Sequence, residues 1–488
     1  MSLKKNGGIL SSLAAAAFLT IFSPAARASD VFSTEKLTTP PPNASGDAAN
    51  PCAGGPAENS ALTLQDAVNL ALCNNPQTRV AWMNARVQAA QVGGLKSAYL
   101  PSLTLNATRT QNSYSPGGNS AANDFNVQLS YLIYDFGTRA GNLENGLQTL
   151  YSLNHAQDAA VQTVFLSAVT DYYQLFAAEA LVDSSKEAER SALESHNAAH
   201  AKFKVGLATV SDELQAKTAW SQAVLTRIQA EGNMRNARGV LANVLGLSPL
   251  RKTSFAPPLE TLPDDRQESD VGRYVEAALE QRPDLLSAQS AVAAARGSLR
   301  AARASGWGTL TVGGELDQGN FAVPPSFSSR QLATANIQLS IPLFTGFNST
   351  YQIRTAEEQE KLRMAQEAQI RTQVELDVWQ AYQNLLTSVQ SVKSAADLVK
   401  SATESERLIF GRYKAGQQNV IDLLAAQSTL AGAKQQYISS VFSWRVNKAA
   451  LAKAMGQLSP DNPANKADRP DSTPAGAGPG KEKKETVK

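Results

Sequence analysis

Long apolar runs are absent from most of this chain of 488 residues. One such run lies near the start, between Ile9 and Phe22, and no comparable stretch follows residue 28. A helix that crosses a bilayer needs about 20 predominantly apolar residues. We therefore expect no membrane-spanning helix in the chain beyond residue 28.

The early apolar run has the features of a secretory signal. Lys4 and Lys5 precede it, and Ala26–Ala28 supplies the small-x-small pattern of a cleavage site. Residues 1–28 are predicted to be a signal peptide cleaved after Ala28; a retained membrane anchor is the alternative reading. No cysteine follows directly, so lipid attachment at the cleavage site is not expected.

An excess of charge of one sign is also missing. The chain has 45 basic and 43 acidic residues, for a net charge of +2, and the basic residues are dispersed. Such a distribution creates no global field that would attract nucleic acid. Nucleic acid is therefore not expected among the partners.

Cysteine is scarce, with only Cys52 and Cys73 present. An exported chain meets an oxidising compartment, where a disulfide can persist. A bridge between the two would close a loop of about 20 residues, worth roughly 3 kcal/mol by the chain-entropy estimate. The alternative is that both remain free thiols.

Arrangements typical of enzymes are not found. His196 and His200 are spaced i, i+4 and could share a helix face, but no third metal ligand has suitable spacing. The glycine-rich stretch 306–315 lacks the lysine and the setting of a phosphate loop. Serine, cysteine and histidine form no recognisable nucleophilic set. We expect neither an enzyme nor a cofactor or metal.

The sequence contains an internal repeat. "FKVGLATVSDELQA" (203–216) returns about 210 residues later as "YKAGQQNVIDLLAA" (413–426), and other landmarks recur in the same order. "LALCNNPQ" is answered by "AALEQRPD", and "LANVLGL" by "LAKAMGQ". A period this long indicates a duplicated domain rather than a solenoid.

The repeat divides the chain into segments. Two flanking segments and the stretch between the copies are rich in Pro, Ser, Gly and Ala, so we expect little order in the two flanks. The predicted segments are a mobile N-terminal stretch 29–61, repeat 1 at 62–248, a linker at 249–270, repeat 2 at 271–458 and a disordered tail at 459–488.

Each copy contains two alternating segments that predict a strand pair. In the first copy, Phe125, Val127 and Leu129 alternate with polar residues, and the pair is expected at about 101–136. The second pair is expected at about 308–344, and the loops within the two pairs are expected at 115–122 and 317–329. Strands of about ten residues with one apolar face are typical of membrane β-barrels. Taken alone, the edge of a soluble β-sandwich would fit them as well.

Long helices are predicted after each strand pair. Residues 137–205 and 346–415 contain no proline and many good helix formers. A helix of about 70 residues would be roughly 100 Å long. Gly206 and Gly416 are placed to end these helices, and return helices are expected at 211–245 and 420–455. The repeated sequences therefore form the tips of two helical hairpins, at about 206–210 and 416–419.

This order of elements, given twice after a signal, resembles the TolC family of outer-membrane factors. The resemblance covers residues 62–458 and rests on the paired "[FY]KxG" turns, "LAxxxG" and "YLIYDFG" taken together. The stretches "LTLQDAVNLALCNNPQTRVAW" and "SAYLPSL" are especially similar to the CyaE-like branch, which serves type I protein secretion.

The resemblance implies a mainly α fold with a small β part. Each chain of a homotrimer would contribute four strands to a 12-stranded β-barrel in the lipid of the outer membrane. The helical hairpins would form an α-barrel in the periplasm. Substrate would pass from an inner-membrane ABC or proton-driven transporter, through a periplasmic adaptor, to the cell exterior.

The resemblance also implies two sets of site residues. An entrance gate would include Asp422, Asp212 and Tyr413. Adaptor docking would involve the residues at the hairpin tips, namely Gly206, Leu207, Gly416 and Gln417. Three copies of one carboxylate around a narrow axis would repel each other and attract cations.

The chain departs from the family pattern at two gate positions. Ala425 stands where efflux relatives often have a second aspartate, and Gln418 where they may have an arginine. A salt-bridge latch and a second acidic ring are therefore not expected here. Asp212 and Asp422 could also act simply as favourable charges at a helix start.

Two other classes of protein remain open at this point. A periplasmic adaptor also carries long hairpins, but usually one per chain, beside a lipoyl-like β domain that the sequence lacks. A trimeric coiled-coil surface stalk would need no pore. The alternating strands, present in both copies, favour the export duct over both.

Overall fold

The computed structural model describes most of the chain after the signal. The described residues are 29–39, 61–114, 118–251, 253–258, 270–323 and 326–458. The predicted signal peptide, most of the predicted mobile N-terminal stretch, most of the linker and the predicted tail lie outside these residues.

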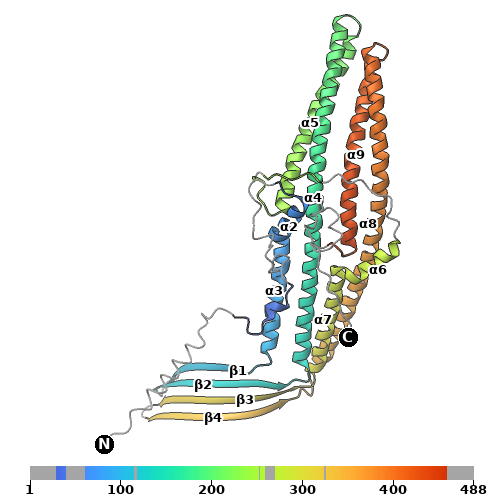
Figure 1. Cartoon of the computed structure of the whole chain (residues 1–488). Helices are drawn as coiled ribbons and strands as arrows, with labels where there is room; N and C mark the ends of the chain where they lie inside the picture. Colours follow the sequence, from blue (N-terminus) through green and yellow to red (C-terminus); the bar gives the residue numbers. More distant parts are fainter. Residues whose placement is uncertain are drawn as a thin grey trace, which may run out of the picture. The chain divides into compact units, whose positions relative to one another are not determined.

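The element order repeats once, as the sequence predicts (Figure 1). The first copy comprises α2 (Leu64–Asn74), α3 (Pro76–Ser97), β1 (Ser102–Tyr114), β2 (Gly118–Tyr134), α4 (Thr138–Lys204) and α5 (Val210–Val244). The second comprises α6 (Val271–Gln281), α7 (Pro283–Ser305), β3 (Thr309–Val323), β4 (Ser326–Ser340), α8 (Asn348–Lys414) and α9 (Val420–Ala454). Among the helices of the described residues, none is both long and apolar enough to cross a membrane.

The paired long helices have equal lengths in the two copies. Both α4 and α8 have 67 residues, and both α5 and α9 have 35. The first short helix, α2, begins with a reciprocal capping box between Thr63 and Asp66. Pro76 is the first residue of α3. The first amides of a helix have no carbonyl partner within the helix, so a proline at this position costs no hydrogen bond.

The strands are longer than the sequence analysis predicts. They have 13, 17, 15 and 15 residues rather than about ten. Residues 118–122 and 317–323, expected in loops, continue the ladders of β2 and β3. Side-chain alternation ends before these residues, but an antiparallel ladder needs only backbone groups, so polar residues can extend it.

The four strands form one antiparallel sheet in the order β1-β2-β3-β4 (Figure 1). Register places apolar residues in rows on one face, such as Leu105, Val127 and Leu316. The opposite face carries polar rows, such as Asn106, Asn126 and Asp317. One face suited to lipid and one suited to water is the pattern of a membrane barrel wall.

The described chain divides into two compact units, and each takes residues from both repeats. Unit 1 combines residues up to 40 with 80–157 and 284–370, and unit 2 contains the remainder. The two units therefore do not coincide with the two repeats, because equivalent segments of both copies pack against each other within each unit. Within unit 1 the sheet is accompanied by α7, most of α3 and the first parts of α4 and α8.

Part of the N-terminal stretch predicted to be mobile is held in unit 1. A short 3-10 helix, η1 (Thr34–Leu37), lies within it. Asn154 on α4 donates a hydrogen bond to the carbonyl of Leu37 (2.9 Å), and Arg86 on α3 forms an ion pair with Glu35. The composition of this stretch does not reveal these contacts because the partners are more than 50 residues away.

A large apolar cluster lies in unit 2 around the buried ring of Tyr172. The cluster joins residues of α2, α4 and α5 with Leu62 and Leu458. The linker contributes too, because Phe255 pairs with Leu62 and the Tyr172 hydroxyl donates to the carbonyl of Ala256. Cys73 in α2 is disulfide-bonded, and Cys52, the other cysteine of the chain, lies outside the described residues.

Unit 1 depends on a very close approach of α4 and α7. A methyl group placed on Gly141 would lie 2.5 Å from the backbone nitrogen of Ala301. One placed on Gly297 would lie 2.6 Å from the backbone nitrogen of Asn145. Contacts this short would force the two helices apart. The two glycines therefore set the spacing between a helix of the first repeat and a helix of the second.

Replacing Gly141 by alanine should destabilise the protein by about 1–3 kcal/mol, the usual cost of overpacking. The measurement is thermal unfolding of the purified protein in detergent, followed by far-UV circular dichroism. Gly94 is the matched control, because it lies in a helix of the same unit and a methyl group placed on it would meet no atom within 4 Å. Gly94→Ala should be neutral or stabilising by about 0.5–1 kcal/mol. Equal unfolding temperatures for Gly141→Ala and the wild type would contradict the packing argument.

Candidate functional site

The two hairpin tips have the same backbone geometry. Gly206 and Gly416 each follow a long helix and each have a φ of 76°. The amide of Leu207 donates to the carbonyl of Lys202 (2.8 Å), and the amide of Gln417 donates to that of Arg412 (2.9 Å). This six-residue closure is the Schellman motif, and its left-handed position favours glycine.

The tip residues are also exposed. Leu207 has 78% of its surface accessible, and Gln417 is likewise exposed. No atom lies within 4 Å of a methyl group placed on Gly206 or Gly416. The left-handed backbone conformation therefore favours glycine at both positions. The space beside each turn is open. All four residues predicted to dock an adaptor lie at these turns.

Asp212 caps the first return helix. Its carboxylate accepts hydrogen bonds from the amide and the hydroxyl of Thr209, at 2.9 and 2.8 Å. The amide of Asp212 donates back to the Thr209 hydroxyl, which completes a capping box. These bonds, first the one from the backbone of Thr209, hold the pKa of Asp212 below its ordinary value. The helix-start role considered from sequence is therefore present.

Asp422 is held within the second tip. Its amide donates to the side chain of Asn419 (2.8 Å), and its carboxylate accepts a hydrogen bond from Gln418. The side chain of Gln418 thus satisfies part of the hydrogen-bonding capacity of the Asp422 carboxylate within one chain. A groove of about 340 Å³ runs past this pair and is also lined by Ala425.

Tyr413 is buried where the two hairpins meet. The ammonium group of Lys202 donates to the carbonyl of Tyr413 and lies 3.8 Å from the centre of its ring. Burial raises the pKa of Tyr413, and the negative charge of Asp212 adds to this effect. Among the described residues, the Tyr413 hydroxyl has no hydrogen-bond partner. The structure thus places Tyr413 close enough to Asp212 for the two predicted gate residues to interact electrostatically, and Tyr413 also contacts Lys202, which sequence reasoning missed.

A second polar contact between the hairpins lies below the tips. The amide of Gln427 on α9 donates to the hydroxyls of Ser191 (2.8 Å) and Ser195 (2.9 Å) on α4. Further along the same helices, Lys434 forms an ion pair with Glu187 (2.6 Å). Sequence reasoning also missed these residues, which carry no local signal beyond being polar within a helix.

The histidine pair takes part in contacts within the first hairpin. His200 contacts Glu213 on α5 (2.6 Å), and the ring of His196 stacks on Trp220 with centroids 5.7 Å apart. Within the described residues, no group of three His, Cys, Asp or Glu side chains is arranged to hold a metal ion.

A larger groove lies between α5 and α9, beside the tips. It has a volume of about 770 Å³ and is lined by Ser211, Leu214, Gln215, Thr218, Ala219 and Gln222 of α5 with Ile421 and Leu424 of α9. Leu214 and Ile421 are 56% and 57% exposed. An apolar groove between two helices suits the apolar face of a third helix.

The chain is similar to known outer-membrane proteins along most of its length. It is 29% identical over 402 residues to Protein CyaE of Bordetella pertussis, covering 81% of this chain and 84% of the relative. It is 22% identical over 422 residues to Outer membrane protein TolC of Escherichia coli, covering 82% and 83%.

Solved structures of such channels share the fold. The Campylobacter jejuni CmeC outer membrane channel superposes with a TM-score of 0.72 at 20% identity, covering 84% of this chain and 91% of that one. The outer membrane protein VceC of Vibrio cholerae gives a TM-score of 0.71 at 18% identity, covering 80% and 96%.

A family description, Outer membrane efflux protein, matches the chain twice, over residues 67–247 and 274–457. The two matches coincide with the two repeats that the sequence and the element order define. The chain therefore belongs to the outer membrane efflux protein family.

Proposed function

We propose that this protein is the exit duct of a tripartite export system in the outer membrane. The observation that carries the proposal is one sheet with an apolar and a polar face, joined in the same chain to two long hairpins with exposed tips. A bilayer does not tolerate unpaired strand edges, so the sheet must be closed by further strands. Three copies would supply twelve strands, with the hairpins extending into the periplasm.

The duct would be passive, because transport energy would come from its partners. A periplasmic adaptor would join it to an ABC or proton-driven transporter of the inner membrane. Similarity to CyaE favours type I protein secretion as the system served. The antibiotic and toluene efflux pump proteins of Pseudomonas putida, which are also similar to this chain, make small toxic compounds the competing class of substrate. The identity of the transporter that docks decides between the two classes of substrate.

The adaptor would dock at the hairpin tips. Leu207 and Gln417 are exposed there, and the groove that contains Leu214 and Ile421 begins within the first turn of the return helices. An adaptor hairpin could pack its apolar residues into this groove while polar residues at the turns set its register. Docking at this place would act directly on the contacts between the two hairpins.

The gate of the duct would depend on the joint between the hairpins. The ammonium group of Lys202 contacts both the carbonyl and the ring of Tyr413. Further along the helices, Gln427 of α9 donates a hydrogen bond to Ser191 of α4. These contacts would stand in for a salt bridge at position 418, which a neutral glutamine side chain cannot form. Separation of the second hairpin from the first would break them and widen the entrance. Asp212 and Asp422 would then supply negative charge along the opening.

Photo-crosslinking in living cells tests the docking site. A photoreactive residue at Gln417 should capture a periplasmic adaptor, identified by mass spectrometry. Capture of an adaptor encoded with an ABC transporter would assign the protein to type I secretion, and one encoded with a proton-driven pump would assign it to efflux. Glu375, exposed on α8 about 60 Å along the helix, is the control and should capture no adaptor. Silence at Gln417 would refute docking at the tips.

Replacing Lys202 by glutamine should favour the open gate. Loss of a cation–π contact costs about 1 kcal/mol, which would raise the ratio of open to closed channels by about fivefold. Single-channel recording in planar bilayers measures this ratio. Lys204→Gln, two residues further along the same turn, is the control because its side chain is exposed. An unchanged open probability for Lys202→Gln would show that Lys202 does not stabilise the closed gate.

A further inference from the structure

The sheet of unit 1 has all its connections to helices at one end. The strands β1 and β3 begin there, after α3 and α7, and β2 and β4 end there, before α4 and α8. The helices of the duct lie in the periplasm, so the opposite ends of the strands face the cell exterior. Each strand therefore has an inner end beside the helices and an outer end.

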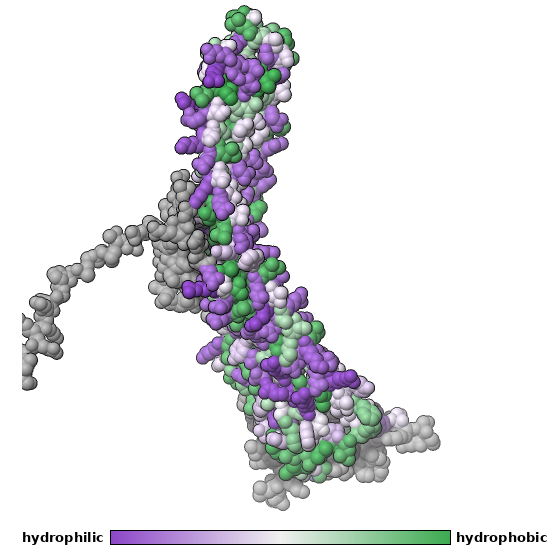
Figure 2. Space-filling model, turned by 90° about the vertical axis from the view of Figure 1, so that its right-hand side faces the viewer, coloured by the Kyte–Doolittle hydropathy of each residue, from purple (hydrophilic) through white to green (hydrophobic). Residues whose placement is uncertain are grey.

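Exposed apolar side chains cover the inner part of one face of the sheet. Leu105, Leu316 and Ile337 lie on this face by register, and the last two are 61% and 75% exposed. On β2 the face is apolar from Phe125 inward to Tyr131. Figure 2 shows hydrophobic side chains gathered at the lower end of its view, where the sheet lies. We call this side of the four strands the lipid face, because lipid chains would cover its inner part.

The lipid face becomes polar toward the outer end. Five exposed residues mark the change, and register places all of them on this face: Arg109 and Gln111 of β1, Asn123 of β2, Gln318 of β3 and Gln331 of β4. Each of these side chains has N–H groups that can donate hydrogen bonds. We call the five residues the donor belt.

The distance of the donor belt from the helices matches the thickness of a membrane. Gln318 is nine residues from Thr309, and Gln331 is nine residues from Ser340, the strand residues nearest the helices. Nine residues extend about 30 Å along a strand. At a strand tilt of about 40°, this length corresponds to a height of roughly 23 Å, close to the apolar band of about 25 Å in outer-membrane barrels. The donor belt therefore lies at the outer boundary of the hydrocarbon.

The charges of the sheet are divided between its two faces. The strands contain three acidic residues, Asp124, Glu315 and Asp317, and register places all three on the polar face. Arg330 belongs to the same register row as Asp124. Arg109 is therefore the one charged residue on the lipid face of the described strands. An anion that approaches the donor belt meets a positive charge and no carboxylate.

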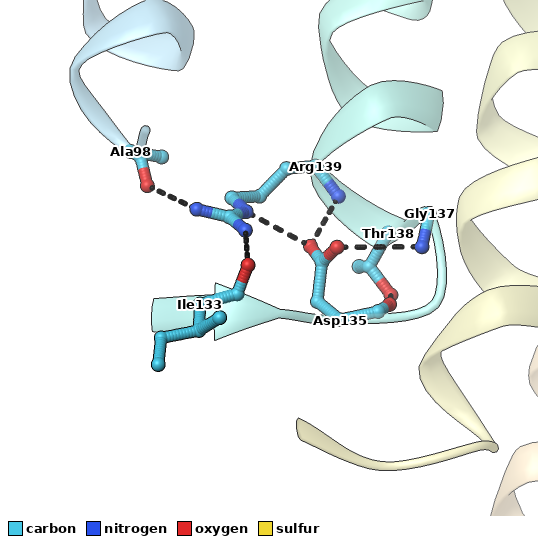
Figure 3. Close-up of polar contacts among 6 residues, drawn as sticks. All are labelled: Ala98, Ile133, Asp135, Gly137, Thr138 and Arg139. Carbon is cyan, nitrogen blue, oxygen red and sulfur yellow. Dashed lines mark hydrogen bonds and ion pairs between the residues drawn. The ribbon is translucent and has the colours of Figure 1, made fainter. Parts of the chain in front are cut away.

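An arginine at the inner end of the sheet has very different surroundings. The guanidinium of Arg139 donates to the carbonyls of Ala98 (3.1 Å) and Ile133 (3.2 Å) and forms an ion pair with Asp135 at 3.2 Å (Figure 3). These contacts join the sheet to α3 and α4. Among the described residues, by contrast, no hydrogen bond or ion pair engages Arg109. Its guanidinium keeps its donors for an acceptor outside the chain.

A phosphate at the membrane surface is the acceptor that suits such a guanidinium. Arginine binds phosphate through paired, charge-assisted hydrogen bonds. The outer leaflet of a bacterial outer membrane is built largely of lipid A, a disaccharide that carries phosphate groups. Its sugar oxygens accept hydrogen bonds from neutral amides such as those of Gln111 and Asn123. The donor belt thus combines one donor for a phosphate with several donors for a sugar.

We propose that the donor belt binds the phosphorylated head group of lipid A, with Arg109 on a phosphate and Gln111 and Asn123 on the adjoining sugar. Such a site lies outside the proposed duct function, although its location rests on the orientation of that duct. Binding would fix the height of the sheet in the outer leaflet. Because Arg139 joins the inner end of the sheet to α3 and α4, the same contact would fix the height of these helices.

The length of the strands fits this placement. β2 continues five residues beyond Asn123, to Gly118, and β3 continues five residues beyond Gln318, to Val323. Five residues add about 16 Å of strand beyond the hydrocarbon. Sugar head groups occupy this layer of the membrane. A ladder that extends into this layer needs no apolar face, which agrees with the end of the alternating pattern in these residues.

Binding of lipid A to the purified protein in detergent tests the donor belt. The probe is fluorescent lipid A that carries both of its phosphates. Arg109→Gln should weaken its binding about fivefold, the usual effect of one basic residue at an anionic lipid surface. Arg109→Lys keeps the charge and should keep most of the affinity. Arg303→Gln, which removes an exposed arginine of the same unit that pairs with Glu357, is the control and should bind like the wild type.

Two further lipids identify the head group. Lipid A stripped of its phosphates should bind the wild type and Arg109→Gln equally, because the contact to be lost is a phosphate contact. Phosphatidylglycerol has a phosphate but lacks the disaccharide, and should bind the wild type more weakly than lipid A. Equal affinity of the wild type and Arg109→Gln for phosphorylated lipid A would overturn the site. Equal affinity of the wild type for phosphatidylglycerol and lipid A would overturn the assignment to lipid A.

Photo-crosslinking in living cells tests the same site in the membrane. A photoreactive residue at Asn123 should capture lipopolysaccharide, detected with an antibody against lipid A. Asn126, three residues away on the polar face of the same strand, is the control and should capture none. Silence at Asn123, or equal capture at both positions, would refute the site. Adaptor capture at Gln417 reports on the duct separately, so a failure of the lipid site and a failure of the duct are distinguishable.

Discussion

An unpaired backbone amide or carbonyl in hydrocarbon costs several kcal/mol, and a row of them along a strand makes an open edge untenable in a bilayer. The sheet of this protein has two such edges, on β1 and β4. A single chain cannot close so few strands into a barrel around a pore. The helices joined to the edge strands, α3 before β1 and α8 after β4, also carry exposed apolar side chains.

The hairpin tips combine well-defined turns with a joint that contains both apolar and polar contacts. Glycine, Schellman closure and capped helix starts recur in both tips, so each turn is well defined by itself. The contacts that join one hairpin to the other near the tips include an apolar cluster around Tyr413 and Leu423 and the polar contacts of Lys202 and Gln427. Separation of the hairpins would break these contacts but leave the turn of each hairpin formed.

Much of the architecture could be predicted because it follows from local patterns of residues in the sequence. Alternation located the strand pairs, the absence of proline located the long helices, and glycine marked both tips. The strand ends were misplaced, since backbone pairing continues through residues 118–122 and 317–323 after the side-chain pattern stops.

The contacts of the candidate site could be predicted only in part. Tyr413, Asp212 and Asp422 were found by resemblance, but Lys202 and Gln427 were not. Lys202 and Tyr413 are 211 positions apart, and no periodicity reports a pairing across that distance. The division into units was hidden for the same reason, because each unit forms from segments of both repeats.

The cap at the first tip also has a consequence for acid tolerance. The pKa of Asp212 is lowered in the folded chain, so its contribution to stability is complete above the ordinary aspartate pKa and is lost only as pH falls through the lower folded value. Mild acid that reaches the periplasm therefore leaves this turn formed.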